Sequence, residues 1–218
     1  MIKIERIPFL LAGAYEKSAR MAIESYYRRV AEEIVTHLPQ GLLLDLGTGP
    51  GYLPIEIARQ SPKIRIVGID LTRRLIEMGR ARAGAAHLSH RIWFQAGNAG
   101  CIPFRDAAFD MVISTGMLHS LKYPVQVIQE MVRVLKTGGE AWIFDPAIVG
   151  NALNFSQWKA SLNLRERFFF KLFQLTGLHK PAKTYTREAA ISLVTQAECR
   201  NFSVEAAGKE IRIKIKKN

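Results

Sequence analysis

The sequence predicts an α/β protein in which helices cover both faces of a parallel sheet. Two observations lead to this prediction. Short apolar runs alternate with helical patterns from residue 42 to residue 146, which is the rhythm of β-α-β units. A glycine-rich turn follows the first apolar run and leads directly into a helix. The length of 218 residues suits a single domain of this kind.

The elements of the core follow one another in a regular order. Apolar side chains at spacing four first predict a long helix over residues 15–38, which Pro39 ends and which packs across the sheet or over its ligand edge. Five strands are predicted at 42–46, 65–70, 92–96, 111–115 and 140–145. Three helices lie between them at 53–60, 72–82 and 124–135, and Gly138-Gly139 ends the last of these units.

The pattern changes after Pro146. Residues 151–176 are helical in pattern and unusually aromatic, with a run of three phenylalanines at 168–170. Core packing would explain such a run, and a lid over a substrate would explain it as well. A helix at 187–198 and two alternating strands at 201–206 and 210–216, joined near Gly208-Lys209, complete the chain.

The glycine-rich turn carries the strongest chemical signal. Gly47, Gly49 and Gly51 follow a hydrophobic strand, where the backbone must turn tightly and approach a ligand without a Cβ in the way. Asp70 ends the second strand, nineteen residues beyond Gly51, where a carboxylate can accept both hydroxyls of a ribose. Together these residues predict a ligand that contains adenosine.

Two details decide between the adenosine ligands. The dinucleotide fingerprint requires a third glycine where this sequence has Tyr52. Asp45 is unfavourable beside a pyrophosphate, whereas it suits a ligand with an ammonium group, directly or through water. S-adenosylmethionine carries an ammonium and a sulfonium and no phosphate, so the residues favour it over NAD.

These residues resemble the motifs of the class I S-adenosylmethionine-dependent methyltransferases. The resemblance spans about residues 40–146 in matching order and spacing, and it is greatest for the small-molecule type that includes the ubiquinone and menaquinone biosynthesis enzymes. The matching segments are 45–51 for the first motif, 68–71 for the ribose strand end, 97–99 with 102–104 for the adenine-edge loop, 109–114 for the fourth strand and 134–140 for the turn before the fifth.

The resemblance implies a Rossmann-like, seven-stranded, mostly parallel sheet with an antiparallel last strand. It also implies S-adenosyl-L-methionine as the cofactor and S-adenosyl-L-homocysteine as the product. The candidate cofactor-binding residues are Tyr15, Asp45, Gly47, Thr48, Gly49, Gly51, Asp70, Leu71, Asn98, Ala99 and Thr115. We expect a single domain with four parts. They are an N-terminal helical cap (1–40), a cofactor-binding core (41–146), a helical lid insertion (147–185) and a last helix with a C-terminal hairpin (186–218).

One position departs from the family pattern. The family usually has Asp in the adenine loop, where this chain has Asn98. The asparagine carbonyl can still accept from the adenine amino group, and its amide can donate to a ring nitrogen. We therefore expect Asn98 to contact adenine.

Methyl transfer from a sulfonium is an in-line displacement, so positioning supplies most of the acceleration. A general base is needed only where the acceptor atom carries a proton. His119 follows the fourth strand by four residues and is the candidate base, although packing or capping of its loop explains it equally well. Asp145, at the end of the fifth strand, could reach a substrate, but a turn-forming role is the simpler interpretation. Tyr15 could close over the cofactor, and an ordinary amphipathic face is the simpler interpretation there.

The favoured function is methyl transfer to a small molecule that is apolar or aromatic. The sequence leaves open whether this molecule is also acidic. An RNA methyltransferase is the enzymatic alternative, because 31 Lys and Arg against 19 Asp and Glu give a net charge of +12. Against RNA, residues 114–117 lack the Asn/Asp-Pro-Pro-aromatic sequence that similar nucleobase enzymes carry. A module that holds the cofactor without catalysis is the second class of function.

The charge is unevenly distributed along the chain. Residues 1–150 have a net charge of +4, and residues 151–218 have a net charge of +8. In the last strand, Arg212, Lys214 and Lys216 alternate with isoleucines, which predicts an edge strand with one charged face in water. Basic residues near the aromatic segment leave contact with an acidic substrate or a membrane surface open.

Two cysteines, Cys101 and Cys199, cannot form a disulfide framework, and no Cys-x-x-Cys or His-x-x-x-His spacing indicates a metal site. These features favour a cytoplasmic protein. The chain has no apolar stretch that approaches the roughly 18 residues of a membrane span.

Overall fold

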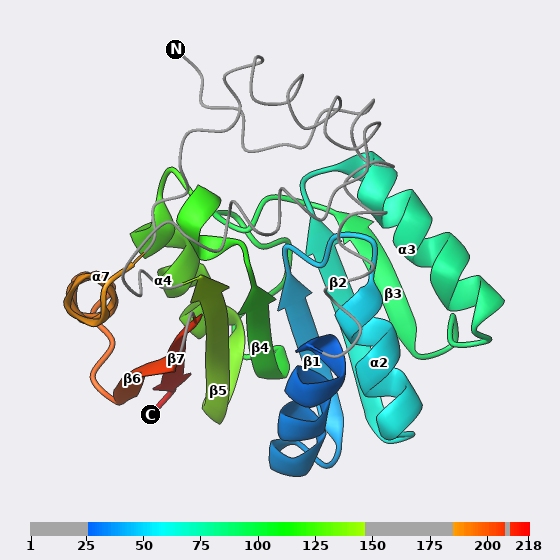
Figure 1. The fold of residues 1–218 in the computed structure, drawn as a ribbon, viewed down its shortest axis with the longest axis horizontal. Coiled ribbons are helices and arrows are strands. Elements are labelled where there is room, and N and C mark those ends of the chain that lie inside the picture. The colour runs from blue at the N-terminus through cyan, green and yellow to red at the C-terminus, as the bar shows by residue number, and fades with distance from the viewer. Residues whose placement is uncertain (1–25, 147–184, 208–209) are drawn as a thin grey trace, which may run out of the picture.

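The computed structural model describes residues 26–146, 185–207 and 210–218 (Figure 1). They contain a seven-stranded sheet in the order β3-β2-β1-β4-β5-β7-β6. The strands are β1 (Gly41–Leu46), β2 (Ile64–Asp70), β3 (Ile92–Ala96), β4 (Phe109–Thr115), β5 (Leu135–Pro146), β6 (Phe202–Ala207) and β7 (Glu210–Lys216). Strands β1 to β5 pair in parallel, and β7 runs antiparallel to both β5 and β6. The predicted fold class is therefore confirmed.

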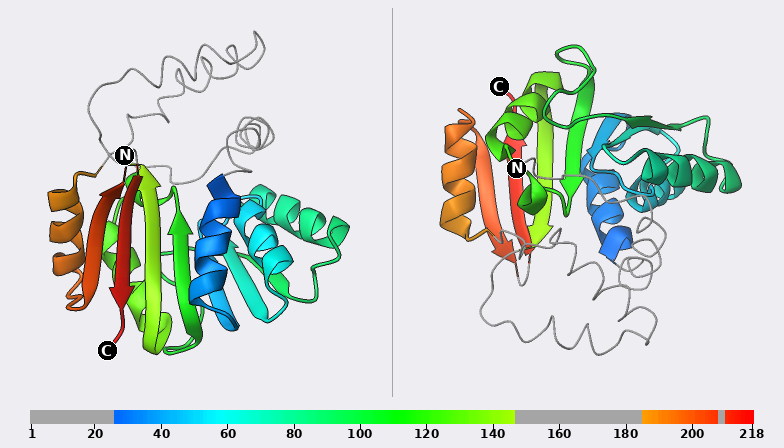
Figure 2. Two further views of the ribbon diagram at one scale, coloured as in Figure 1. Left: turned by 60° about the horizontal axis from the view of Figure 1, so that its bottom comes forward. Right: turned by 90° about the horizontal axis from the view of Figure 1, so that it is seen from above.

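Helices cover both faces of this sheet (Figures 1 and 2). A helix over residues 26–37 packs on one face with α2 (Tyr52–Gln60) and α3 (Arg73–Ala85), and α4 (Pro124–Val134) and α7 (Arg187–Gln196) pack on the other. Alternate strand residues feed the two cores: Leu43 and Met111 belong to the first, Leu44 and Val112 to the second. This alternation follows from the period of two along a strand.

One predicted boundary is wrong. Gly138-Gly139 does not end a unit, because β5 begins at Leu135, directly after α4, and continues through both glycines. Gly138 has φ 78°, and a Cβ on Gly139 would lie 2.7 Å from the Asp110 carbonyl oxygen. The glycines therefore let β5 bend and approach β4 closely, which is a common use of glycine inside a strand.

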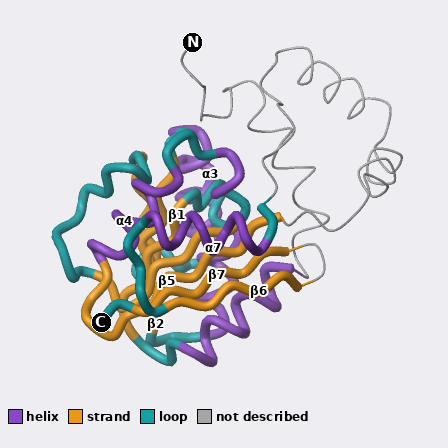
Figure 3. Tube along the Cα trace, turned by 90° about the vertical axis from the view of Figure 1, so that its left-hand side faces the viewer, coloured by secondary structure: helices purple, strands orange, loops and turns teal. Residues whose placement is uncertain are grey.

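The interpretation of β7 as a solvated edge is also wrong. β7 lies between β5 and β6, so β6 is the edge strand (Figure 3). Arg212 and Lys214 lie over the rings of Phe144 and Trp142, and both pair with Glu33. The charged face of the strand is covered at Arg212 and Lys214, because the helix over residues 26–37 packs across them, whereas Lys216 is exposed as predicted. Its isoleucines are buried, as predicted.

Several predictions fall outside the described residues. These are Tyr15, the first part of the predicted helix 15–38, the predicted lid 147–185 except for its last residue, and the turn at 208–209. The described part of that helix, 26–37, packs on the face of the sheet through Val30 and Ile34. Among the helices that the structure describes, none has the length and apolar character needed to cross a membrane.

The strand order places a ligand edge in the centre of the sheet. β1 pairs with β2 on one side and with β4 on the other. The chain continues from β1 to β2 on the first side and from β4 to β5 on the second, so the strand order reverses between β1 and β4. In open α/β sheets, ligands bind beyond the carboxyl ends of the strands at such a reversal of order. The ends of β1, β2, β4 and β5 are therefore where a site is expected.

Candidate functional site

The glycine-rich turn lies at the carboxyl end of β1. Gly47, Gly49 and Gly51 all have positive φ, of 72°, 54° and 80°. The backbone N–H groups of Gly47 and Thr48 donate to the Ile69 carbonyl, which fixes the turn against the end of β2. Among the described residues, no atom lies within 4 Å of a Cβ built on Gly49, so none of them covers this part of the turn. The structure thus offers bare backbone to a ligand there.

The Phe94 ring of β3 packs against the glycine turn. This ring occupies the space that a Cβ on Gly51, Gly68 or Gly79 would need, at 2.5, 2.9 and 3.0 Å. Strand β3 therefore contacts the glycine turn through the Phe94 ring, which packs closely against the backbone of these glycines. Sequence reasoning missed Phe94 and Gly79, because their contact with the turn is made only by the fold.

Helix α3 holds the same region from the side. Arg82 donates to the carbonyl oxygen of Pro50 and lies over the Tyr52 ring, with 4.0 Å between its Cζ and the ring centroid. Arg80 donates to the Phe94 carbonyl at 3.1 and 2.7 Å. Both guanidinium groups are thus bonded to the backbone that shapes the turn.

Asp70 ends β2 beside the turn. Its Oδ2 accepts from the Gly49 N–H at 3.0 Å, and its Oδ1 accepts from the Thr72 N–H at 2.8 Å. Burial raises the pKa of this carboxyl, and the two backbone donors oppose that effect. Leu71 follows it and is half-buried. The predicted ribose ligand therefore also ties the second strand end to the turn.

Asp45 is the most perturbed carboxyl of the site. It is 1% exposed, and its Oδ1 has no hydrogen-bond partner among the described residues. Burial raises its pKa from 3.8 to about 7; the Thr48 side chain opposes this effect, and the negative charge of Asp70 adds to it. A positively charged ligand group would favour the ionised form and relieve this cost.

Three further buried polar atoms of the described residues have no partner. They are Thr48 Oγ1, Ser114 Oγ and Asp145 Oδ2. All four residues belong to the carboxyl ends of β1, β4 and β5 or to the turn after β1. Buried polar groups are almost always hydrogen-bonded, so their concentration at one edge marks a polar site. The sequence indicated Asp45 and Thr48 but not Ser114. Thr115 follows it at the strand end and is half-buried.

His119 and Asp145 form a hydrogen-bonded pair at the same edge. His119 lies in the short 3-10 helix η2 (Leu118–Ser120), just after β4. Asp145 Oδ1 lies 2.9 Å from His119 Nδ1 and also accepts from the His119 backbone N–H at 3.2 Å. Thus Asp145, for which a turn-forming role was the simpler interpretation, orients His119 instead.

Asn98 lies in the loop after β3. Its side-chain oxygen accepts from the Gly100 N–H at 2.8 Å, and its backbone bridges to Cys101. This oxygen is the atom expected to accept from the adenine amino group. In the structure it accepts from the Gly100 N–H and so stabilises the turn at residues 98–101. Ala99 is half-buried and Asn98 is exposed.

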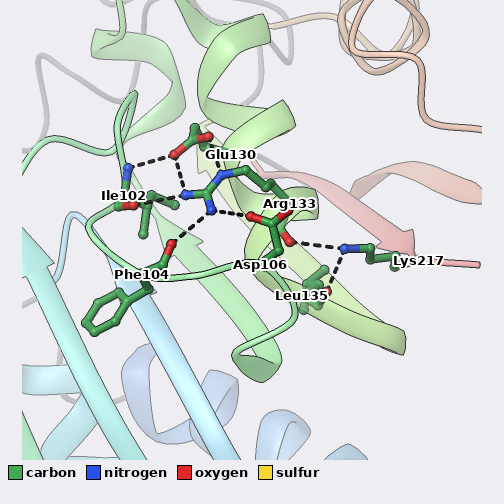
Figure 4. A network of polar contacts seen from close by, with 7 residues as sticks. All are labelled: Ile102, Phe104, Asp106, Glu130, Arg133, Leu135 and Lys217. Carbon is green, nitrogen blue, oxygen red and sulfur yellow. Dashed lines mark hydrogen bonds and ion pairs between the residues drawn. The ribbon is translucent and has the colours of Figure 1, made fainter.

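Helix α4 clamps the rest of this loop through one face (Figure 4). Arg133 donates to the carbonyl oxygens of Ile102 and Phe104 at 2.9 Å each, and Glu130 accepts from the Ile102 N–H at 2.7 Å. Arg133 also pairs with Glu130 and Asp106, at 2.6 and 2.7 Å. These pairs lower the pKa of Glu130 and raise that of Arg133. Sequence reasoning missed this clamp.

Comparisons with known proteins agree with this geometry. A family model described as "Methyltransferase domain" matches residues 40–189. The ubiquinone/menaquinone biosynthesis C-methyltransferase UbiE of Geotalea uraniireducens is 31% identical over 147 residues, which are 66% of this chain and 63% of that protein. The demethylmenaquinone methyltransferase of Deinococcus radiodurans is 37% identical over 112 residues, which are 51% of this chain and 45% of that protein. The chain thus spans less than two thirds of these relatives.

A solved structure shares the fold. It is a candidate S-adenosyl-L-methionine-dependent methyltransferase from Methanococcus maripaludis, with a TM-score of 0.75 and 23% identity. The match covers 95% of this chain and 92% of that one.

Proposed function

The chain belongs to the methyltransferase-domain family whose model matches residues 40–189, and we propose that it transfers the methyl group of S-adenosylmethionine to a small molecule. The observation that carries the proposal is the set of unpartnered buried polar atoms at the carboxyl ends of the central strands. A buried polar atom without a partner costs about 1–3 kcal/mol, which a bound ligand or water recovers.

The donors and acceptors of the site fit S-adenosylmethionine group by group. The ammonium suits Asp45, whose unpartnered oxygen gains a bond and whose ionised form gains a counter-charge. The ribose hydroxyls suit Asp70. Each of its oxygens already accepts one backbone N–H, and a carboxylate has about four acceptor positions in all.

We assign the adenine of the cofactor to the loop after β3. The Asn98 oxygen accepts from the Gly100 N–H and has a second lone pair for the adenine amino group, and the amide NH₂ can donate to a ring nitrogen. Leu71 and Ala99, both half-buried, offer apolar surface to the ring. The clamp from α4 keeps this loop in place.

A dinucleotide suits the site less well. Asp45 and Asp70 both lie beside the glycine turn, where a pyrophosphate would meet two carboxyl groups. Arg80 and Arg82, the nearby cations, are bonded to backbone carbonyls. The site therefore favours a cationic ligand over an anionic one.

S-adenosylmethionine, when bound, supplies an electrophilic methyl group on a sulfonium. The protein's part is then to hold the reactants in line and to exclude water. The space above Gly49 and Gly116 gives the reactants room, because a Cβ on either glycine would meet no atom of the described residues within 4 Å. Thr48 and Ser114 supply buried hydroxyl groups at the same strand ends, and neither hydroxyl has a hydrogen-bond partner among the described residues.

For the acceptor, we propose a small aromatic molecule methylated on carbon. The support is the activity of the relatives, since the Geotalea uraniireducens protein is a ubiquinone/menaquinone biosynthesis C-methyltransferase and the Deinococcus radiodurans protein is a demethylmenaquinone methyltransferase. The aromatic segment 155–173, outside the described residues, suits the same class of acceptor. RNA is less well supported, since Arg212 and Lys214 are already paired with Glu33.

For the compartment, we propose the cytoplasm. Cys101 and Cys199 are both free, and Cys101 is exposed. Proteins with free exposed thiols are typical of reducing compartments.

Calorimetry with S-adenosylmethionine tests the cofactor, and transfer of a radiolabelled methyl group to a metabolite extract, total RNA and total protein tests the acceptor. We expect binding, and label in the metabolite fraction alone. Gly49→Ala places a methyl group in the space above the turn and should weaken binding tenfold or more, by about 1.4 kcal/mol. Gly84→Ala, in α3, is the matched control, because a Cβ there meets only the Ser89 Oγ at 3.8 Å.

Two outcomes would contradict the proposal. Absence of cofactor binding would exclude a methyltransferase, and label in RNA alone would exclude a small-molecule acceptor. Binding without label in any fraction would favour a non-catalytic module.

A further inference from the structure

The pair of His119 and Asp145 has a geometry that a structural contact does not need. Asp145 is fully buried at its side chain, whereas the His119 side chain is 23% exposed. One carboxylate oxygen bonds both the imidazole and the backbone N–H of His119, and the other has no partner. Both bonds of this buried carboxyl therefore go to His119, which fixes the ring and its loop together.

This arrangement determines which nitrogen of the neutral imidazole carries the proton. A carboxylate can only accept, so Nδ1 must be the donor and Nε2 must carry the lone pair. Among the described residues, Nε2 of His119 has no hydrogen-bond partner. An imidazole that is held by a buried carboxylate at Nδ1 and has its lone pair at Nε2 is the arrangement of a general base, because the carboxylate keeps the correct tautomer and stabilises the imidazolium that forms.

The pair also lies at the proposed cofactor site. Met117 directly precedes η2, and its Sδ lies 2.8 Å from where a Cβ on Gly47 would be. The first glycine of the turn and the helix that carries His119 are thus packed against each other. A shift of either one would move the base relative to the turn.

We propose that Asp145 is a positioning residue, that His119 Nε2 is the general base it orients, and that the methyl acceptor therefore carries an acidic proton, as a phenolic hydroxyl or an activated C–H does. This inference rests on the proposed function. An acceptor with a free lone pair, such as a tertiary amine, needs no such pair of residues. Tyr185, whose pKa is raised by burial and by the charge of Asp145, lies beside the same carboxylate.

The step balances without another reactant. An acceptor with a phenolic hydroxyl gives that proton to Nε2 of His119, and the electron pair left on oxygen is shared with the ring. A π pair at the neighbouring ring carbon forms the new bond to the methyl carbon of S-adenosylmethionine, and the pair of the broken carbon–sulfur bond stays on sulfur, which becomes a neutral thioether. The hydrogen of that ring carbon then moves as a proton to the ring oxygen through water, which restores the aromatic ring.

Nitrogen-15 NMR of the imidazoles tests the inference in the full chain without any substrate. The chain has five histidines, and His119→Gln assigns the signal of interest. We expect neutral His119 to be protonated at Nδ1 in the wild type and to lose that preference in Asp145→Ala. Addition of S-adenosylhomocysteine should shift the Nε2 resonance of His119.

The chain offers a matched control within the same spectrum. His37 Nε2 lies 3.0 Å from Glu140 Oε2, five residues before Asp145 in β5, so the opposite tautomer is expected there. Glu140→Ala should change the His37 signal and leave His119 unaffected. S-adenosylhomocysteine should not shift the His37 nitrogens.

Kinetics supply the second readout. In labelled methyl transfer to the metabolite extract, His119→Gln should lower the rate about 10²–10⁴-fold while calorimetry shows an unchanged affinity for S-adenosylhomocysteine. A wild-type His119 protonated at Nε2, or an unchanged rate in His119→Gln, would overturn the inference. Loss of cofactor binding by the wild type would instead overturn the proposed function, so the two failures are distinguishable. The wild-type tautomer decides the question even if Asp145→Ala fails to fold.

Discussion

At the scale of single residues, Asp45 shows how a site lowers the stability of its own fold. The carboxyl is buried without a full set of partners, and its pKa is raised from 3.8 to about 7. In the unfolded chain the group ionises near its ordinary pKa, whereas in the folded protein it holds its proton until about pH 7. The folded state therefore binds more protons between pH 4 and pH 7, and stability falls as pH rises through that window.

We predict that Asp45→Asn makes the protein more stable at pH 8 than the wild type. A shift of about three pKa units corresponds to on the order of 4 kcal/mol of folding free energy. The wild type loses this stability above pH 7 and keeps it below pH 4, so the gain of the variant should be seen at high pH. Urea unfolding of both proteins at pH 4.5 and pH 8 measures the difference. A gain of equal size at the two pH values would contradict the pKa shift.

The same variant should bind S-adenosylmethionine more weakly at pH 8, because the neutral amide offers no counter-charge to the ammonium. Calorimetry on the samples used for unfolding makes the comparison direct. Greater stability with lower affinity is the pattern expected of a residue kept for binding. A variant that is stabilised and binds as tightly as the wild type would remove Asp45 from the ammonium site.

At the scale of elements, helix α4 keeps the adenine-edge loop in shape. Glu130 and Arg133 lie three residues apart on one helix face and together bond the backbone of Ile102 and Phe104. Gln126, one turn earlier, donates to the Gly100 carbonyl at 2.8 Å. The loop has little regular structure of its own, so its conformation depends on these three side chains, of which Figure 4 shows Glu130 and Arg133.

We predict that Arg133→Met lowers the free energy of unfolding by about 1–3 kcal/mol, since it leaves two backbone carbonyls and Glu130 without their donor. The loss should lie at the lower end of that range, because the Arg133 side chain is 31% exposed. Hydrogen exchange of the amides at 100–106 should become faster, and thermal unfolding gives the stability.

Arg59→Met is the matched control for this prediction. Arg59 also pairs with a glutamate three residues earlier, Glu56 at 3.7 Å, but its side chain is 61% exposed and contacts no loop backbone. Its loss should cost less than about 0.5 kcal/mol, as is typical of exposed helix pairs. Equal losses from the two variants would mean that the clamp contributes no more than a surface ion pair.

At the scale of the whole molecule, the N-terminal helix joins the last strand. Glu33 pairs with Arg212 and Lys214, which follow it by 179 and 181 residues. Arg29 of the same helix pairs with Glu210. These contacts join the helix over residues 26–37, on one face of the sheet, to the last strand of the sheet.

We predict that Glu33→Gln lowers the free energy of unfolding by about 1–2 kcal/mol, because the Arg212 side chain, 16% exposed, then keeps only Glu210 as an anionic partner. Glu32→Gln is the control, since Glu32 is an exposed neighbour with no ion pair among the described residues. Urea unfolding compares the two variants. Similar effects would show that the ion pair does not hold the helix to the sheet.

The sequence alone determined the elements and the chemistry of the glycine turn. The bounds of β3 and β7 match the prediction, because β3 is a short apolar run beside turn residues and β7 alternates strictly between charged residues and isoleucines. Gly49 and Asp70 were recognisable for the same reason, since their roles depend on local backbone conformation and spacing. The residues of the turn thus lie where their order in the chain predicts.

Only the tertiary structure decided which distant residues meet. Asp145 was interpreted as a turn residue, and Arg212 as a solvated charge, because neither has its partner nearby in the sequence. The pairing of β4 with β5 brings Asp145 to His119, and the insertion of β7 between β5 and β6 places Arg212 under Glu33. The pattern of a segment shows what its residues prefer, but strand order, which depends on burying all the apolar faces together, decides what they contact.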